Sequence, residues 1–311
     1  MILGIDTSNY TTSAALLDGK KFISRRILLP VREGTRGLRQ RDAVFHHVKQ
    51  LPVILEELPF SSCSINAVSV STTPRNVKGS YMPAFLPGES TARAIAAALN
   101  VPLYRFSHQE GHIAAGIYSS SAFALLKKPF ISVHLSGGTT EILKSEYKNG
   151  RIQTEIIGKT LDISAGQLID RVGVDLGLCF PCGKEADSLS RLSVSPVKLP
   201  VSVKGGDINF SGAETKCKAF YSRCDKADIL NGVFVCIADS LIKALKSCIA
   251  EYNINDILFV GGVASNSLIR SRLSEMLHAN IIYASAELST DNAVGTAYLG
   301  YLNHGSLSDM Q

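Results

Sequence analysis

The chain has 311 residues, of which 45% are hydrophobic and 19% are charged, and its formal net charge is +5 at pH 7. This length is long for one hydrophobic core and predicts two domains. Polar residues interrupt the apolar runs before about 18 residues, which excludes a membrane-spanning helix and a membrane partner. The first residues, Met-Ile-Leu-Gly-Ile-Asp, are typical of a strand rather than a secretion signal, so a cytoplasmic location is expected.

Seven cysteines are scattered along the chain. An odd, scattered set indicates reduced thiols rather than a disulfide framework. Cys179 and Cys182 have the spacing of a redox or zinc pair, but no second such pair accompanies them, and a simple turn is the other interpretation. The mild positive charge permits a polyanionic partner such as RNA without requiring one.

The first part of the chain predicts a strand meander followed by alternating helices and strands. In chain order we expect strands at 2–6, 13–17 and 22–29, a helix at 42–58, a strand at 67–71, a loop at 72–87, a helix at 89–99 and a strand at 101–106. A Ser/Thr-rich turn at 7–12 joins the first two strands. The apolar helical pattern that follows begins at His108.

The same plan starts again at residue 130. We expect strands at 130–135, 141–145 and 152–157, helices at 163–176, 185–192 and 227–252, a strand at 257–260, a Gly-rich turn at 261–266 that enters a helix, a strand at 281–283 and a last helix that Asp291 opens. The repeated plan predicts an α/β protein with two similar lobes. We place one lobe at 1–115, with a C-terminal helix at 293–311 packing back on it, and the other at 116–292.

The predicted sheets would place a ligand between the lobes. Sheets of this kind bind ligands at the carboxyl ends of their strands. The Ser/Thr-rich turns at 7–12 and 136–140 recur at matching places, and their N–H groups and hydroxyls suit a phosphate. The paired turns therefore favour a nucleotide cleft.

His108 and His112 lie four residues apart at the start of a helical pattern. Residues at this spacing share one face of a helix, so two imidazoles can bind one metal ion together with a carboxylate from elsewhere. The other interpretation is that both histidines merely cap or pack a helix.

Seven segments spread over the chain resemble the TsaD/Gcp/Kae family of tRNA N6-adenosine threonylcarbamoyltransferases in order and spacing. They are Gly4–Ser8, Ser107–His112, Leu135–Thr139, Gly158–Asp170, Asn209–Gly212, Gly261–Asn266 and Ser289–Asn292. The resemblance implies the actin/Hsp70/sugar-kinase fold, with two duplicated lobes around a nucleotide cleft. It also implies transfer of a threonylcarbamoyl group from threonylcarbamoyl-AMP to N6 of adenosine 37 in tRNAs that read ANN codons.

The resemblance also implies roles for individual residues. One divalent ion, Fe(II) or Zn(II), would be bound by His108, His112 and Asp291. Asp170 would accept bonds from ribose hydroxyls, and Asn266 would meet the adenine or its ribose. The full set implied for binding threonylcarbamoyl-AMP or ATP is His134, Leu135, Ser136, Gly137, Gly138, Asp170, Gly183, Asp187 and Asn266. No further catalytic group is assigned, because AMP is a good leaving group.

The partners implied by the resemblance are tRNA, a small paralogous TsaB-like subunit and, in bacteria, a TsaE-like ATPase. Basic residues in the first quarter of the chain form either a tRNA contact or a solvated face; they are Arg25, Arg26, Arg32, Arg36, Arg39, Arg41 and Lys49. His134 is either an extra metal ligand or a strand residue that bonds locally.

Three segments depart from the family pattern. Asn9–Thr12 lacks the acidic pair that is usual in bacterial members, Thr73–Gly79 replaces a Gly-Pro-Gly segment, and Pro181–Lys184 replaces Gly-Gly-Pro. Two alternatives therefore stay open. One is a metal-dependent carbamoyltransferase that acts on a small molecule through a carbamoyl-adenylate. The other is a non-catalytic paralogue subunit, which the retained histidine pair disfavours.

Overall fold

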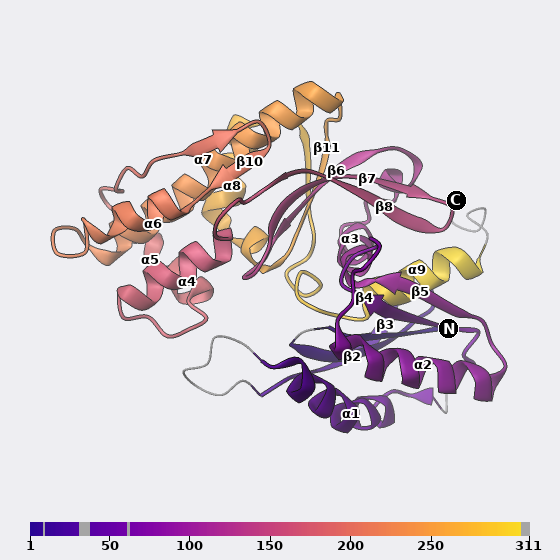
Figure 1. Ribbon diagram of the computed structural model, residues 1–311. Coiled ribbons are helices and arrows are strands. Elements are labelled where there is room, and N and C mark those ends of the chain that lie inside the picture. The colour runs from indigo at the N-terminus through magenta and orange to yellow at the C-terminus, as the bar shows by residue number, and fades with distance from the viewer. Residues whose placement is uncertain (9, 31–37, 61–62, 306–311) are drawn as a thin grey trace. The chain divides into compact units, whose positions relative to one another are not determined.

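The computed structural model describes residues 1–8, 10–30, 38–60 and 63–305 (Figure 1). The chain forms two compact units. Unit 1 comprises Met1–Lys127, Tyr147–Gln153 and Glu287–Gln311, and unit 2 comprises Lys128–Glu146 and Thr154–Ala286. In the part of the chain that is described, no helix has the length and apolar character needed to cross a membrane.

Unit 1 is built on a five-stranded sheet with the order β3-β2-β1-β4-β5. Its strands are β1 (Ile2–Thr7), β2 (Thr11–Leu17), β3 (Phe22–Leu28), β4 (Ala67–Thr73) and β5 (Leu103–Ser107). β2 pairs antiparallel with β1 and β3, whereas β4 pairs parallel with β1 and β5. Every residue of β1 and β2 is buried, so neither strand shows the alternation of a half-exposed strand.

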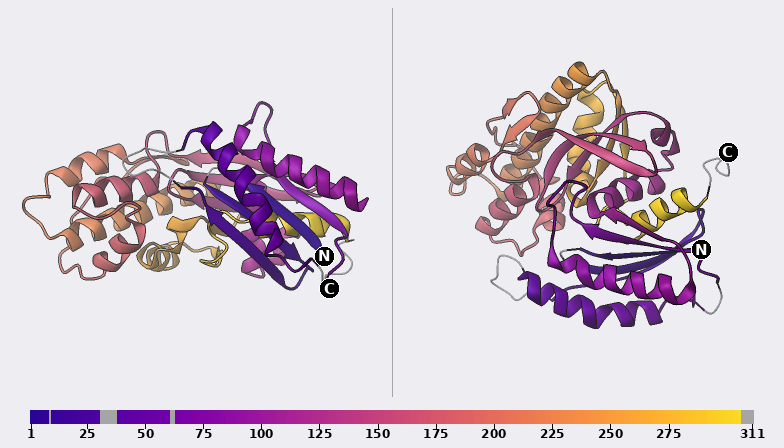
Figure 2. Two further views of the ribbon diagram at one scale, coloured as in Figure 1. Left: turned by 90° about the horizontal axis from the view of Figure 1, so that it is seen from below. Right: turned by 45° about the vertical axis from the view of Figure 1, so that its right-hand side comes forward.

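Helices cover both faces of the unit 1 sheet (Figures 1 and 2). One face carries α1 (Gln40–Glu56) and α2 (Leu86–Leu99), which follows a short 3-10 turn at Pro83–Phe85. The other face carries α3 (His108–Ser119), which precedes a 3-10 turn at Phe123–Lys127, and α9 (Val294–His304). α9 contacts β1, β2 and β4, so the end of the described chain returns to its first strands.

Unit 2 repeats the sheet of unit 1. Its main sheet has the order β12-β11-β6-β7-β8, with β6 (Phe130–Leu135), β7 (Thr140–Lys148), β8 (Arg151–Lys159), β11 (Asp256–Val260) and β12 (Asn280–Tyr283). β6 pairs antiparallel with β7 and parallel with β11, and β11 pairs parallel with β12. From β8 to β12 this is the strand order of unit 1, so the duplicated plan predicted from the sequence is confirmed.

The helices of unit 2 surround a core centred on one long helix. They are α4 (Ala165–Asp175), α5 (Gly183–Ser190), α6 (Ser211–Lys218), α7 (Lys226–Tyr252) and α8 (Ser267–Met276), which follows a 3-10 turn at Gly262–Ser265. The apolar side of α7 supplies Phe234, Ile237 and Leu241 to the core. The sequence did not indicate α6 or the hairpin of β9 (Ser202–Lys204) and β10 (Asp207–Asn209). An eight-residue helix and three-residue strands are too short to show a clear hydrophobic period.

The last helix begins later than the sequence indicated. α9 starts at Val294, and its N-cap residue is Ala293, not Asp291. Asn292 causes the delay: its amide donates to the carbonyls of Leu288 (3.0 Å) and Thr290 (2.7 Å), and its Oδ1 accepts from the Val294 N–H (3.0 Å). Asp291 therefore lies in a wound loop. α9 ends at His304, and the part of the expected helix beyond 305 lies outside the described residues.

A buried histidine fixes the first turn of unit 1. His47 on α1 is completely buried, with Nε2 2.8 Å from the Ser8 carbonyl and Nδ1 2.8 Å from the Thr12 hydroxyl. The carbonyl can only accept, so Nε2 carries the proton. Burial lowers the pKa of His47. The folded ring therefore stays neutral at pH values where an exposed histidine is protonated.

We predict that replacing His47 with Gln lowers the free energy of unfolding by about 1–3 kcal/mol at about pH 8, because the Ser8 and Thr12 groups lose a buried partner. The difference in unfolding free energy between the wild type and the variant should become smaller towards about pH 5.5. Below about pH 6.5 the unfolded wild-type chain binds a proton at His47 that the folded chain does not, so wild-type stability falls while the variant lacks this loss. Urea unfolding at both pH values measures this difference, with the exposed His278→Gln as control. An equal difference in unfolding free energy at both pH values would contradict the assignment of His47 as a neutral buried ring.

Candidate metal centre and nucleotide-binding residues

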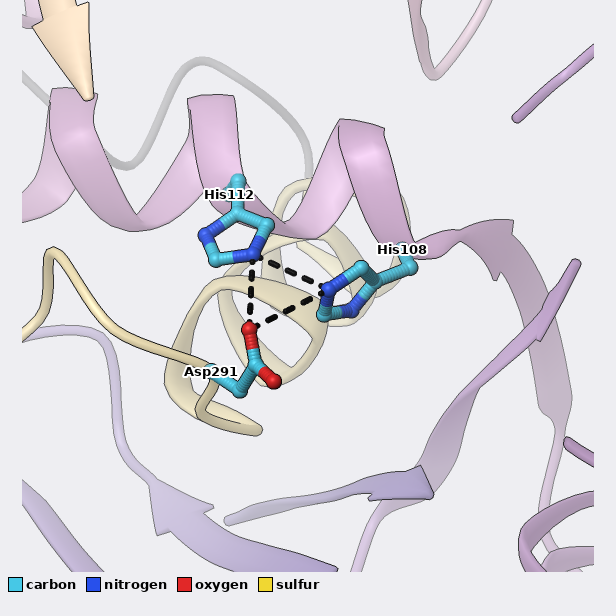
Figure 3. A group of neighbouring side chains, drawn as sticks. All are labelled: His108, His112 and Asp291. Carbon is cyan, nitrogen blue, oxygen red and sulfur yellow. Dashed lines mark hydrogen bonds and ion pairs between the residues drawn. The ribbon is translucent and has the colours of Figure 1, made fainter. Parts of the chain in front are cut away.

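The histidine pair is placed by a well-capped helix start. The Ser107 hydroxyl accepts from the Glu110 N–H, and the Glu110 carboxylate accepts from the Ser107 N–H, which forms a capping box. His108 is then the first residue of α3, and His112 follows one turn later on the same side. The two Nε2 atoms lie 3.0 Å apart and point toward the same space (Figure 3).

Asp291 completes a group of three possible metal ligands within unit 1. Its Oδ1 lies 3.2 Å from Nε2 of His112 and 3.5 Å from Nε2 of His108 (Figure 3). The loop that carries it is held from outside as well, because Arg26 on β3 donates to the Thr290 hydroxyl at 2.5 Å. Among the described residues, these three form the group whose ligand atoms lie within 4.8 Å of one another. The structure thus brings together residues that the sequence separates widely.

Two glycines allow the helix and the loop to approach. A Cβ on Gly295 would lie 1.9 Å from the Gly111 carbonyl oxygen and 2.7 Å from the Ala115 nitrogen. A Cβ on Gly111 would lie 2.9 Å from the Thr296 hydroxyl. Only glycine fits at such a crossing of α3 and α9. Gly111 directly precedes His112, so the crossing sets the distance between the histidines and the Asp291 loop.

The charges at this group favour a cation. Burial alone would lower the pKa of His108, but the carboxylates of Asp6 and Asp291 outweigh it and raise the pKa to about 10. The pKa of Asp291 moves the other way, because its bonds to the two histidines outweigh its burial and hold it well below the usual range. A divalent ion can replace the proton that these carboxylates attract. Two imidazoles with one carboxylate are a donor set that suits Fe(II) or Zn(II), so the residues fit the implied ion.

Glu110 lies between the two histidines in sequence but takes no part in the ligand group. Its oxygens accept from the Ser107 N–H and hydroxyl, both at 2.8 Å, and from the Arg151 guanidinium at 2.7 and 3.0 Å. The carboxylate is almost fully buried and fully bonded. It anchors the start of α3 and is not available as a general base.

Asp6 on β1, which was not predicted from the sequence as a site residue, supports the site. Its Oδ2 lies 2.7 Å from Nδ1 of His108, on the side of the ring away from the ligand group. A carboxylate at the carboxyl end of a strand was the signal that could have indicated it, because such ends gather at one edge of the sheet.

In unit 2, the turn after β6 is packed against a helix start and another strand end. The Ser164 hydroxyl, at the N-cap of α4, donates to the Gly137 carbonyl at 2.7 Å. Gly261 follows β11 with φ +97, and a Cβ there would strike the Leu135 carbonyl. Next to Gly137 and Gly138, by contrast, a Cβ would meet nothing within 4 Å. The turn at 136–138 is thus packed against its neighbours on both sides, while Gly137 and Gly138 have free space where a side chain would lie.

The other predicted nucleotide residues form two small groups in unit 2. Asn266 caps α8, and its amide donates to Asp187, which also accepts from Arg191 at 2.6 Å. Asp170 on α4 accepts from the Cys182 N–H at 2.8 Å, and burial raises the pKa of this carboxyl. Gly183 begins α5 with open space around its α-carbon. His134 sits in β6, opposite Glu141 of β7 and Val260 of β11.

Cys182, the second cysteine of the Cys179–Cys182 pair, does not have the properties of a reactive thiol. Cys182 is buried, and burial raises the pKa of its thiol to about 11. A redox-active thiol needs a lowered pKa. Cys182 precedes α5 as its N-cap residue.

The chain matches one family model and many relatives. A family model described as "TsaD: tRNA N6-adenosine threonylcarbamoyltransferase" matches residues 32–298. A protein of that name from Thermosipho africanus is 30% identical over 319 residues, which are 97% of this chain and 93% of the relative. Another from Dehalococcoides mccartyi is 32% identical over 313 residues, 96% and 92% of the two chains.

Solved structures resemble the chain in fold. HypF from T. kodakarensis gives a TM-score of 0.64 at 14% identity, over 97% of this chain and 48% of that chain. A ROK family glucokinase from Streptomyces griseus gives 0.55 at 11% identity, over 98% and 99%. At these identities the likeness concerns the fold alone, and it confirms the sugar-kinase-like fold expected from the sequence.

We predict that Gly295→Ala disrupts the ligand group, because the new methyl must push α9 away from the backbone of α3. Overpacking of this kind costs about 1–3 kcal/mol. Zinc affinity, measured by competition with a chromophoric chelator, should fall by at least about 10-fold, as when the support of a ligand is lost. Gly212→Ala is the matched control, because Gly212 also lies in a helix and has open space around it. Unchanged zinc affinity in Gly295→Ala contradicts this role of the crossing.

Proposed function

The chain belongs to the tRNA N6-adenosine threonylcarbamoyltransferase family, and on that premise we propose that it transfers a threonylcarbamoyl group from threonylcarbamoyl-AMP to N6 of adenosine 37 in tRNAs that read ANN codons. The family is one of acyltransferases. The observation that carries the proposal is the convergence of His108, His112 and Asp291, which lie on a helix and a distant loop yet place three ligand atoms within 4.8 Å of one another.

His108, His112 and Asp291 would hold one divalent ion, iron or zinc. Such an ion, when bound, supplies a Lewis acid that polarises a carbonyl oxygen, which an amine as weakly nucleophilic as adenine N6 requires. The chain orients its two imidazoles through the capped start of α3 and holds the carboxylate through the turn that Asn292 winds. A capped helix start and a loop held by hydrogen bonds of Asn292 suit a site that must keep its geometry.

The adenylate would be bound by unit 2. The open glycine faces at 137 and 138 let a ligand approach the backbone closely. Asp170 would accept bonds from the ribose hydroxyls. Asn266, held by Asp187, would meet the adenine or its ribose. AMP leaves as a stable anion, so these residues need only bind and orient.

A small paralogous subunit would pair with the helical face of unit 1, and an ATPase would join in bacteria. α1 exposes Phe45, Val48 and Val53. Apolar side chains gathered on one exposed helix are typical of a protein interface.

tRNA would meet the basic residues at the start of α1. Arg39 and Arg41 expose their side chains there, and Arg41 also pairs with the adjacent Asp42 at 3.5 Å. Arg25 is paired with Glu57 at 3.2 Å. Arg32 and Arg36 lie outside the described residues. Phosphate contacts of this kind bind RNA without reading its sequence.

We expect Asp291→Asn to abolish tRNA modification, because the ligand group loses its anionic member. The assay is complementation of cells that lack their own enzyme, scored by mass spectrometry of the modified adenosine in their tRNA. A loss of more than about 100-fold is expected, the upper range for a lost metal-supporting interaction. Glu275→Gln, on the exposed side of α8, should complement fully. Failure of the wild-type chain to modify tRNA would instead favour a carbamoyltransferase for small molecules or a non-catalytic subunit.

Reversing the charge of Arg39 and Arg41 together should weaken tRNA binding for all tRNA sequences alike. The dependence of affinity on salt should flatten by about one unit of slope for each lost phosphate contact. Filter binding across a range of salt concentrations measures both quantities. Lys243→Glu, an exposed position on α7, serves as control. Equal salt slopes for the variant and the wild type refute the assignment of this surface.

A further inference from the structure

Asp6 is a buried carboxylate with three partners, all of which are donors. Its Oδ1 accepts from the Ser8 N–H at 2.8 Å, and its Oδ2 accepts from the Ser71 hydroxyl at 3.2 Å. The same Oδ2 lies 2.7 Å from Nδ1 of His108. The side chain is 1% exposed, so no water competes for these bonds.

We propose that Asp6 is a positioning residue for the metal site: it accepts a hydrogen bond from the Nδ1–H of His108 and so leaves the Nε2 lone pair of that ring for the ion. A neutral imidazole carries its proton on one nitrogen and a lone pair on the other. The Asp6 oxygen that lies 2.7 Å from Nδ1 acts as a hydrogen-bond acceptor, which keeps the proton of the ring on Nδ1. The Nε2 atom then faces His112 and Asp291 with its lone pair.

Asp6 itself is held on all sides by the sheet of unit 1. It pairs with Ser13 across the β1–β2 ladder, and the Ser13 hydroxyl donates to its backbone carbonyl at 3.2 Å. Ser71 on β4 lies 3.0 Å from the hydroxyl of Thr296 on α9. A continuous chain of bonds therefore joins α9, β4 and β1 to the ring of His108. A support fixed in this way holds the imidazole in one orientation.

The geometry separates Asp6 from the ligands. Its carboxylate is outside the group of ligand atoms that lie within 4.8 Å of one another in the described residues. It touches the nitrogen of His108 that points away from that group. Carboxylate–histidine–metal arrangements raise the basicity of the ligating nitrogen and fix its direction.

Asn at this position cannot reproduce the arrangement. It has one oxygen for two donor directions, the Ser8 N–H and the His108 N–H. If its oxygen faces Ser8, its amide faces Nδ1, and the ring must carry its proton on Nε2, where the ion would bind. If its oxygen faces His108, the Ser8 N–H is left opposite an NH2 group.

The inference rests on the metal site of the proposed function, and the test separates the two. The full chain is freed of metal with a chelator and titrated with Zn(II) in competition with a chromophoric chelator. Asp6→Asn should bind zinc about 10–100-fold more weakly than the wild type. Ser71→Ala should lose less, because the carboxylate keeps its bonds to Ser8 and His108. Asp18→Asn, which removes a carboxylate from a distant turn, should bind as the wild type does.

A second measurement does not depend on whether Asp6→Asn folds. Nitrogen-15 NMR of the zinc-loaded wild type should show His108 protonated at Nδ1 and zinc-bound at Nε2. Zinc on Nδ1, or wild-type affinity in a folded Asp6→Asn, overturns the role of Asp6 while leaving the metal site intact. A wild-type chain that binds no zinc overturns both this inference and the metal site.

Discussion

The close crossing of α3 over α9 is the constraint on which the candidate metal centre depends. Gly111 and Gly295 bring the two helices to a backbone distance that no side chain permits. His112 follows Gly111 directly, and Asp291 lies four residues before Gly295, so the crossing brings both ligands close together. Neither element needs an unusual local conformation. The site arises because two ordinary segments are allowed to approach.

Around that crossing, each functional side chain is supported by hydrogen bonds that water cannot easily replace. Glu110 and Ser107 fix where α3 begins, and Arg151 neutralises the buried Glu110 carboxylate. Asn292 winds the loop that presents Asp291. Buried and fully bonded supports of this kind hold ligands in place before an ion arrives, which reduces the ordering that binding would otherwise require.

Much of the fold could be predicted from the sequence, because hydrophobic patterns and turn residues report local structure. The repeated order of strands predicted both sheets, and the spacing of His108 and His112 predicted that they share one face of a helix. Asp291 could not be found in this way; its assignment came from a family resemblance, since no local pattern tells which distant loop a helix will meet. Asp6 was not predicted for the same reason, since its partner His108 is 102 residues away in the sequence. The start of α9 was misplaced because the bonds of Asn292 delay the helix, and β9, β10 and α6 were too short to show a period.

X-ray absorption at the metal edge of the purified chain, loaded with iron or zinc, shows most directly whether His108, His112 and Asp291 bind an ion. We predict one divalent ion per chain, bound by two imidazole nitrogens and at least one carboxylate oxygen. The spectrum of His112→Ala should lack one of those nitrogens. A substoichiometric ion, or sulfur among its ligands, would show that the three converging side chains do not form the site.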